Sequence, residues 1–262
     1  MTRIVPLGTN GFFPANGRQT MAFLVLTERQ ALLLDAGTGI SRMIEPAVVA
    51  LLRPFDSLDV ILSHYHLDHV IGLSYMPAAW NRGRVRVFGP ADPLVEGDPK
   101  TALDQLLTVP LFPARYQTFP APLDPIAVRE ERFSVGELEV RLRRQSHPGG
   151  SVGIRIGDEI AYLTDTAADA AAVDFVRGAR ILLHELWETD EEAAQAEKFG
   201  HSHFSGLAGF VRSACVPVVM PVHHHPRRSG PEVRALCERL GERAGVGVIF
   251  PDEGKVFELD AL

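Results

Sequence analysis

A short segment, SHYHLDHV at residues 63–70, holds the densest group of side chains in the chain that are able to bind metal ions. His64 and His66 are two positions apart, so in an extended loop both imidazoles project to the same side, within reach of one ion. Asp68 and His69 follow at an expected helix start and can turn toward a second ion. A polar loop with chance histidines is the alternative, but the apolar strand directly before the group favours a metal pair.

Further candidate ligands stand at the ends of three later predicted strands. His147 follows the run ELEVRLRRQS, Asp165 follows IAYLT, and His223 follows VPVVMPV. Taken alone, each of these is as readily explained as a turn residue, a helix cap or a loop residue. Together with the first group they give one potential ligand after each of several strands, which is the arrangement that a composite metal site requires.

The elements that would position these residues are short β-rich runs with helical patterns between some of them. Strands are expected at residues 3–7, 21–26, 31–35, 60–63, 84–88, 138–143, 152–156, 159–163, 181–183, 216–222 and 246–250, with a last one at 255–259. Helices are expected near residues 41–52, 69–76, 168–177, 191–199, 205–214 and 231–244. The succession of strands, helix and strands occurs twice along the chain. It predicts an α/β (α+β) fold, a four-layer αββα sandwich whose two sheets face one another.

The chain of 262 residues is expected to form a single domain, residues 1–262, because one core can grow to this size. One region, at about residues 89–124, departs from the pattern because its high proline content breaks regular structure. We expect a partly helical excursion with a long loop there. The part around Leu111 to Tyr116, with Phe112, Pro113 and Tyr116, is a candidate for a wall or lid over the site, and core packing is the alternative for Phe112.

The composition restricts the partners and the location of the chain. A net charge of −7, with no basic tail, argues against a general affinity for nucleic acid or for an acidic membrane. No apolar run approaches the roughly 20 residues that span a bilayer, and no leader pattern opens the chain, so a cytoplasmic location is expected. Cys215 and Cys237 are too few for a disulfide framework and are assigned no function. A homo-oligomer is compatible with all of this.

At this point the sequence resembles the metallo-β-lactamase superfamily. The resemblance is carried by nearly the whole chain, through the segments PLGTNGFFP, LLLDAGTGI, SHYHLDH, YLTDT and VHHHP together with His147. It implies the αββα sandwich, with a dinuclear site between the two sheets. The implied ligands are two groups of three and one carboxylate that bridges them: His64, His66 and His147; Asp68, His69 and His223; and Asp165. His224 and His225 remain alternatives for the last ligand.

A narrower resemblance is to the ribonuclease Z-like and small phosphodiesterase branch, through ILLHELWETDEEAAQAEKFGHSH. It implies that His201 lies beside the leaving group and that Glu185 orients the ring of His201. Asp68 is expected to be catalytic as well as a metal ligand. His66 stands where oxygen-reducing relatives carry Glu, and Asp165 stands where β-lactam-hydrolysing relatives commonly use Cys. The resemblance therefore implies hydrolysis with two divalent ions, Zn²⁺ first and Mn²⁺ or Fe²⁺ as alternatives.

The expected function is a dinuclear-metal-dependent hydrolase, a phosphodiesterase for a small phosphodiester or nucleotide-like substrate, acting through a metal-bound hydroxide. Transfer RNA precursors are disfavoured because Asp165 follows His147 after only eighteen residues, which leaves no room there for the RNA-binding arm of many ribonuclease Z enzymes. Three alternatives stay open: a lactone, thioester or carboxylic ester hydrolase on the same site, an RNA-processing nuclease, and a metal-binding protein with lapsed catalysis.

Overall fold

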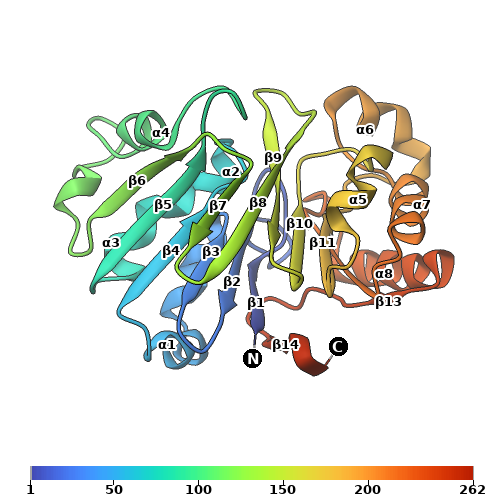
Figure 1. Ribbon diagram of the computed structural model, residues 1–262, viewed down its shortest axis with the longest axis horizontal. Helices are drawn as coiled ribbons and strands as arrows, with labels where there is room; N and C mark the ends of the chain where they lie inside the picture. The colour runs from blue at the N-terminus through green and yellow to red at the C-terminus, as the bar shows by residue number, and fades with distance from the viewer. Residues whose placement is uncertain (1, 262) are drawn as a thin grey trace.

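The computed structural model describes residues 2–261 and has four layers: helices, two facing sheets, and helices again (Figure 1). The first seven-stranded sheet has the order β14-β1-β2-β3-β4-β5-β6, and the second has the order β13-β12-β11-β10-β9-β8-β7. Helices α1, α3 and α4 lie on one side of the sheet pair and α5, α7 and α8 on the other (Figure 1). The αββα sandwich expected from the sequence is confirmed.

The first sheet combines an antiparallel part and a parallel part. Its strands are β1 (Arg3–Gly8), β2 (Ala22–Leu26), β3 (Ala31–Leu34), β4 (Ser57–Ile61), β5 (Arg84–Pro90), β6 (Leu123–Val128) and β14 (Phe257–Glu258). Strands β14, β1, β2 and β3 pair antiparallel, whereas β3, β4, β5 and β6 run parallel. Because parallel strands end at the same edge of a sheet, the turns after β3 and β4 lie next to one another.

The second sheet repeats this design. Its strands are β7 (Arg132–Val135), β8 (Leu138–Gln145), β9 (Ser151–Ile156), β10 (Ile160–Leu163), β11 (Ile181–Glu185), β12 (Val218–Val222) and β13 (Gly247–Val248). Strands β7 to β10 pair antiparallel and β10 to β13 run parallel. Every residue of β10, β11 and β12 is buried, as expected for strands covered on both faces.

The helices are short except for the last two. The α-helices are α1 (Pro46–Leu52), α2 (Leu67–Val70), α3 (Met76–Ala79), α4 (Pro99–Leu106), α5 (Val173–Val176), α6 (Ala193–Phe199), α7 (Phe204–Ala214) and α8 (Gly230–Ala244). The 3₁₀ helices are η1 (Thr38–Ile44), η2 (Ile71–Tyr75), η3 (Tyr116–Thr118), η4 (Ala170–Ala172), η5 (Asp190–Glu192) and η6 (Leu259–Ala261). Helix α8 begins at a capping box of Ser229 and Glu232 and ends at Gly245 in the left-handed conformation. No helix within residues 2–261 has the length and apolar content of a membrane span.

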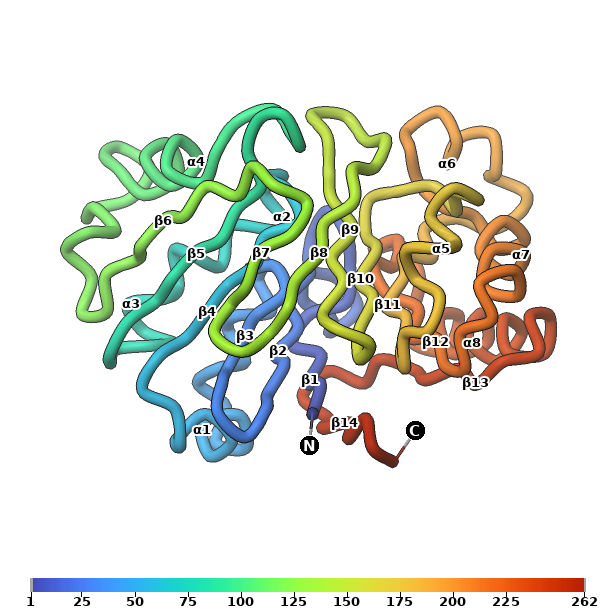
Figure 2. The backbone as a smooth tube through the Cα atoms, in the orientation of Figure 1, coloured from blue at the N-terminus to red at the C-terminus, as the bar shows by residue number. Residues whose placement is uncertain are grey.

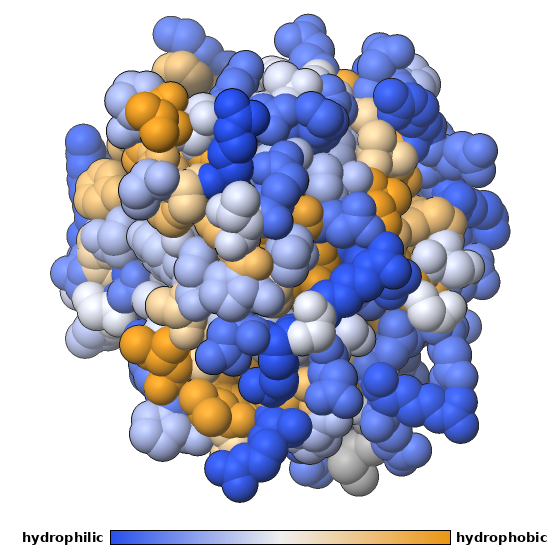
Figure 3. Space-filling model, turned by 90° about the vertical axis from the view of Figure 1, so that its left-hand side faces the viewer, coloured by the Kyte–Doolittle hydropathy of each residue, from blue (hydrophilic) through white to orange (hydrophobic). Residues whose placement is uncertain are grey.

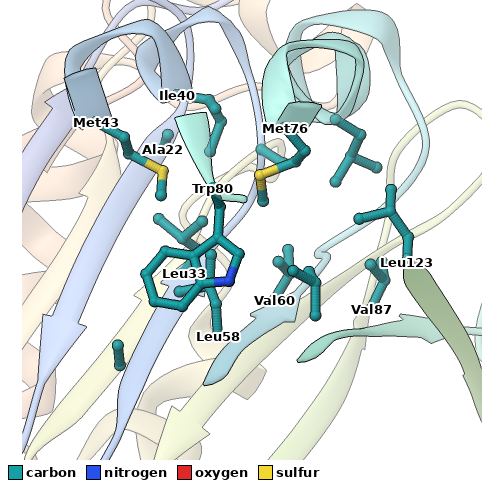
Figure 4. Close-up of a cluster of buried hydrophobic side chains, with 14 of the residues drawn as sticks. Ala22, Leu33, Ile40, Met43, Leu58, Val60, Met76, Trp80, Val87 and Leu123 are labelled. Carbon is teal, nitrogen blue, oxygen red and sulfur yellow. The ribbon is translucent and has the colours of Figure 1, made fainter. Parts of the chain in front are cut away.

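Apolar side chains fill all three spaces between the four layers. Between the sheets, the rings of Phe23 and Tyr162 lie 5.7 Å apart. Outside the first sheet, Trp80 is buried against Leu33 and Leu58 (Figure 4). The strands are therefore held rigidly from both faces, and the ends of β3, β4, β10 and β12 give fixed attachment points for a site.

The proline-rich segment is more ordered than expected. Besides helices α4 and η3 it leads into β6, an unpredicted strand that pairs parallel with β5, and β7 was also not expected. Pro125 lies within β6, which is an edge strand. Proline is tolerated there because its missing N–H does not remove a hydrogen bond between strands. Tyr116 is buried and Phe112 packs against Phe119, 5.7 Å between ring centroids, so the lid interpretation is wrong and core packing is correct.

The excursion also lies on an outer side of the molecule. Figure 2 shows it beyond β5 and β6, on the side of the fold opposite to α7 and α8. Figure 3 views the molecule from this side and shows a largely hydrophilic face on which apolar residues form small separate groups. None of the residues from 89 to 124 lines the cavity described below.

Candidate metal centre

The seven sequence-predicted ligands follow the ends of strands from both sheets. His64 and His66 follow β4, with α2 carrying the next two ligands, while His147, Asp165 and His223 follow β8, β10 and β12. Asp165 and His223 have φ values of 51° and 52°, in the left-handed region that non-glycine residues seldom adopt. Such backbone strain, of order 1–3 kcal/mol, concentrates at functional sites.

The first group comprises His64, His66, His147 and Asp165, whose ligand atoms all lie within 4.8 Å of one another. The Nδ1 atom of His66 and the Nε2 atom of His147 are 3.1 Å apart. The Oδ1 atom of Asp165 is 3.4 Å from Nε2 of His147 and 3.9 Å from Nε2 of His64. Three imidazole nitrogens and one carboxylate oxygen therefore converge on a single point.

The second group comprises Asp68, His69 and His223, again within 4.8 Å. The Oδ2 atom of Asp68 is 3.4 Å from Nε2 of His69 and 3.5 Å from Nε2 of His223. The Oδ2 atom of Asp165 reaches the same two nitrogens at 3.1 and 3.3 Å. Asp165 thus directs one oxygen to each group, which is the geometry of a bridging carboxylate.

These residues fit a pair of divalent cations. Several buried imidazole nitrogens that face the two groups have no hydrogen-bond partner, namely Nε2 of His64, of His69 and of His223. Orphaned buried polar atoms are costly, and a cation that accepts their lone pairs removes that cost. Burial would raise the pKa of Asp165, yet the charges of the neighbouring histidines lower it well below its usual value. The carboxylate is therefore ionised, as a ligand must be.

Asp35 supports the site and was not identified as a site residue from the sequence. It is fully buried after β3, with φ of 57°, and its Oδ2 accepts from Nδ1 of His69 at 2.8 Å and from the hydroxyl of Tyr162 at 2.6 Å. Its Oδ1 accepts from the amide of Ser63 at 2.7 Å. By holding the Nδ1 proton of His69, Asp35 leaves Nε2 free as a ligand. The sequence pattern that could have identified Asp35 is an Asp at the end of an apolar strand, as for Asp165.

The predicted acid pair is also present. Glu185 is the last residue of β11 and fully buried, and its Oε2 accepts from Nδ1 of His201 at 2.9 Å. The same oxygen lies 3.3 Å from Nδ1 of His223, and Oε1 accepts from the amide of Ser202. Burial lowers the pKa of His201, but the charge of Glu185 and its hydrogen bond outweigh this and raise it. One carboxylate therefore orients both His201 and His223.

The structure separates the three neighbouring histidines after β12. His223 belongs to the metal group, whereas neither of its two neighbours is within ligand distance of it. The ring of His224 is buried, and its main chain bonds to Thr9 and Gly11 of the N-terminal loop. The ring of His225 is half-buried at the mouth of the site, 4.6 Å from the ring of Trp187. The geometry favours His223 as the last ligand.

A cavity of about 700 Å³ opens over these groups. Its floor includes Asp68, Asp165 and His223, and His201 reaches it from the side. Sequence reasoning missed two of its wall residues, Phe12 and Trp187, although their segments had been singled out for the resemblance. Nothing in the sequence indicated that these two aromatic rings would be turned toward the cavity.

The N-terminal loop, residues 9–20, closes one side of the centre. The amide of Phe12 donates to Oδ2 of Asp68 at 2.6 Å, and the amide of Gly11 donates to the carbonyl of His224 at 3.0 Å. A Cβ atom at Gly11 would lie 2.5 Å from Nε2 of His223, closer than non-bonded atoms approach. Gly11 therefore allows the loop to approach a proposed ligand directly.

We expect Gly11→Ala to lower metal content and kcat/KM by about 10- to 100-fold, because the new methyl group must displace the His223 ring. Metal analysis of the purified variant and steady-state kinetics measure the two effects. Gly209→Ala is the matched control, since a Cβ at Gly209 meets no atom within 4 Å. Full metal content and unchanged kinetics in Gly11→Ala would contradict the proposed role of His223.

An αββα sandwich with histidines and carboxylates at the ends of its strands is the architecture of a metal-dependent hydrolase. Residues 30–224, well over half of the 262-residue chain, match the family model of the beta-lactamase superfamily domain. The chain therefore belongs to this superfamily. The resemblance inferred from the sequence is confirmed.

Curated relatives carry the name ribonuclease Z. The protein from Saccharolobus solfataricus is 26% identical over 267 residues, which cover 87% of this chain and 90% of the relative. The protein from Methanosarcina mazei is 23% identical over 305 residues, covering 98% and 94%.

Solved structures share the fold. The metallo-beta-lactamase fold protein YhfI from Bacillus subtilis has a TM-score of 0.76 at 19% identity, covering 98% of both chains. Yeast PDE1 has a TM-score of 0.72 at 13% identity, covering 97% of this chain and 98% of the other. The short form of human tRNase Z has a TM-score of 0.66 at 18% identity, covering 98% and 99%.

Proposed function

We propose that this chain is a phosphodiesterase with two metal ions, Zn²⁺ by preference, that acts on a small phosphodiester or nucleotide-like substrate. The observation that carries the proposal is the position of His201, which lies beside Asp165 and is held by the buried carboxylate of Glu185. The departure of an alkoxide from phosphorus benefits from such a positioned proton donor. The name of the curated relatives denotes cleavage of RNA, whose linkages are phosphodiesters, and supports the same bond type.

The proposed metal ligands are the two groups that the structure brings together: His64, His66 and His147; Asp68, His69 and His223; and the bridging Asp165. When bound, two divalent ions supply a water of lowered pKa, roughly 7, and offset the negative charge of the phosphodiester. The set of nitrogen and carboxylate ligands suits Zn²⁺, and also Mn²⁺ or Fe²⁺.

The remaining residues orient the groups that react. Asp35 fixes the ring of His69, and Glu185 fixes the rings of His201 and His223, so that the nitrogens facing the cavity keep their positions. Because Glu185 raises the pKa of His201, the imidazolium form is more populated than it would be in a free histidine. His201 then donates a proton to the oxygen of the departing group, and Glu185 stabilises its charge beforehand.

Metal analysis and a substrate panel test the proposal. The Zn²⁺-loaded protein should hydrolyse bis(4-nitrophenyl) phosphate or a cyclic nucleotide, and the panel includes RNA and lactones. RNA is included because the expectation of no general nucleic-acid affinity rests on net charge alone, while the curated relatives are named ribonuclease Z. A profile restricted to lactones would overturn the phosphodiesterase proposal.

We expect His201→Ala to lower kcat on the best phosphodiester by about 10²-fold while both metal ions stay bound, because general acid help is lost. His203→Ala is the matched control, since His203 pairs with Asp190 and does not line the cavity. Full activity of His201→Ala on a substrate with a poor leaving group would refute the role of His201.

A further inference from the structure

The walls of the cavity above the metal groups are apolar, although its floor is polar. Phe12, Leu67 and Phe199 line it and are 71%, 61% and 47% exposed. Trp187 and Pro148 complete the walls. Large apolar side chains that stay exposed around one concave site mark a surface for an apolar ligand group.

The apolar residues form two walls, one beside Asp68 and one beside His201. Leu67 immediately precedes Asp68, and the amide of Phe12 donates to the same Asp68 carboxylate at 2.6 Å. On the other wall, the ring of Trp187 stacks on His201 with centroids 4.9 Å apart and an interplanar angle of 23°. Phe199 lies two residues before His201. An apolar group bound by either wall is therefore next to the proposed reaction centre.

The conformation of Phe12 places its ring in this position at a cost. Its φ of 65° lies in the left-handed region, where a bulky residue is an outlier. Core packing does not account for the conformation, because the side chain is 71% exposed. The hydrogen bond from its amide to Asp68 holds the strained backbone in place. The loop thus presents an aromatic ring to the cavity.

The charges of the lining select against a polyanion. No lysine or arginine among residues 2–261 lines the cavity, and its ionisable residues apart from histidine are Asp68, Asp165 and Glu188. A strand of RNA would place further phosphates beside these walls, where cations normally supply binding energy. The positive charge at the cavity comes from the metal groups and His201, since Arg228, behind the lining, is paired with Glu188 at 3.0 Å. That charge is sufficient for one phosphodiester.

We propose that the substrate is a phosphodiester with a single negative charge that carries an apolar, preferably aromatic, ester group, and that Phe12, Leu67, Trp187 and Phe199 bind this group. The inference rests on the proposed phosphodiesterase function and specifies its substrate class. It also assigns Phe12 and Phe199 as residues that determine specificity.

The test compares two diesters with the same leaving group, bis(4-nitrophenyl) phosphate and methyl 4-nitrophenyl phosphate, with the Zn²⁺-loaded full chain. The ratio of their kcat/KM values is measured for each variant, because differences in intrinsic reactivity cancel when ratios are compared. Phe12→Ala and Phe199→Ala should each lower the ratio by about tenfold, the loss expected for one aromatic contact. Leu111→Ala, which changes an exposed apolar residue that does not line the cavity, should change it less than about twofold.

Calorimetry separates the failure of this proposal from the failure of the proposed function. Diphenyl phosphate should bind about tenfold or more tightly than dimethyl phosphate, and Phe12→Ala should remove the preference. That preference without turnover of any phosphodiester would support the apolar walls and overturn the phosphodiesterase proposal. Unchanged ratios in both the Phe12 and Phe199 variants, or a higher kcat/KM for an oligoribonucleotide than for the bis-aryl diester, would overturn the inference.

Discussion

Asp165→Ala should lower kcat/KM on phosphodiesters by about 10⁴-fold, a loss of about 5.5 kcal/mol of transition-state stabilisation. Asp165 is the residue whose two oxygens face both metal groups, at 3.4 Å from His147 in one and 3.1 Å from His69 in the other. Removing it breaks the bridge and leaves a gap between the two ligand sets. Metal analysis should show fewer than two bound ions per chain.

The same substitution should alter how metal affects stability. In the wild-type chain, saturating Zn²⁺ should raise the free energy of unfolding, by about 4 kcal/mol at a thousand times the dissociation constant. Asp165→Ala should show a much smaller rise in Tm on addition of Zn²⁺, because its ligand set is incomplete. Asp169→Ala is the control, since this carboxylate pairs with Arg143 outside the metal groups. Two tightly bound ions in Asp165→Ala would contradict the bridging role.

The metal groups could be predicted because their positions follow from strand ends. A His or Asp shortly after a strand marks the point where the chain leaves the sheet, and such a residue follows β4, β8, β10 and β12 by one to three positions. Asp35 stands in the same position after β3, but the sequence pattern placed it as the last residue of the expected strand at 31–35. The same criterion, a His or Asp at the end of a predicted strand, identifies Asp35 when it is applied to every strand.

The cavity walls could not be predicted in this way. Phe12 faces the cavity because its amide bonds to Asp68, 56 positions away in the chain, and no local pattern indicates that contact. Trp187 lies two residues after the buried strand β11, where an apolar ring is normally assigned to the core. Strand β6 was missed for a related reason, since Pro125 argues against a central strand but is tolerated at an edge.

The loop that carries Phe12 is held by a partly buried ion pair between Arg42 and Glu253, outside the metal groups. Nε and Nη2 of Arg42 donate to Oε2 of Glu253 at 3.0 and 2.8 Å, and Glu253 is 5% exposed. Oε1 of Glu253 accepts from the amide and hydroxyl of Thr9 and from the amide of Gln19, all at 3.0 Å. Glu253 therefore ties the C-terminal segment to both ends of the loop, residues 9–20.

Arg42→Met should lower the free energy of unfolding by about 3 kcal/mol, because it leaves a buried carboxylate without its cation. Urea unfolding followed by circular dichroism measures the loss. The exposed pair of Arg29 and Glu137 provides the control, and Arg29→Met should cost less than about 1 kcal/mol. Equal losses in the two variants would contradict the role of Arg42.

The loss in Arg42→Met should also depend on pH. Burial raises the pKa of Glu253, while Arg42 opposes the rise, so removing Arg42 raises this pKa further. A carboxyl group whose pKa is higher in the folded state binds more protons there, so its contribution to stability is lost as pH rises through the folded-state pKa. The variant should therefore be less impaired at about pH 5 than at about pH 7, since protonation of Glu253 removes the unpaired charge. A loss that is the same at both pH values would mean that Arg42 acts through packing instead of charge, and that the loop is held by the amides of Thr9 and Gln19 alone.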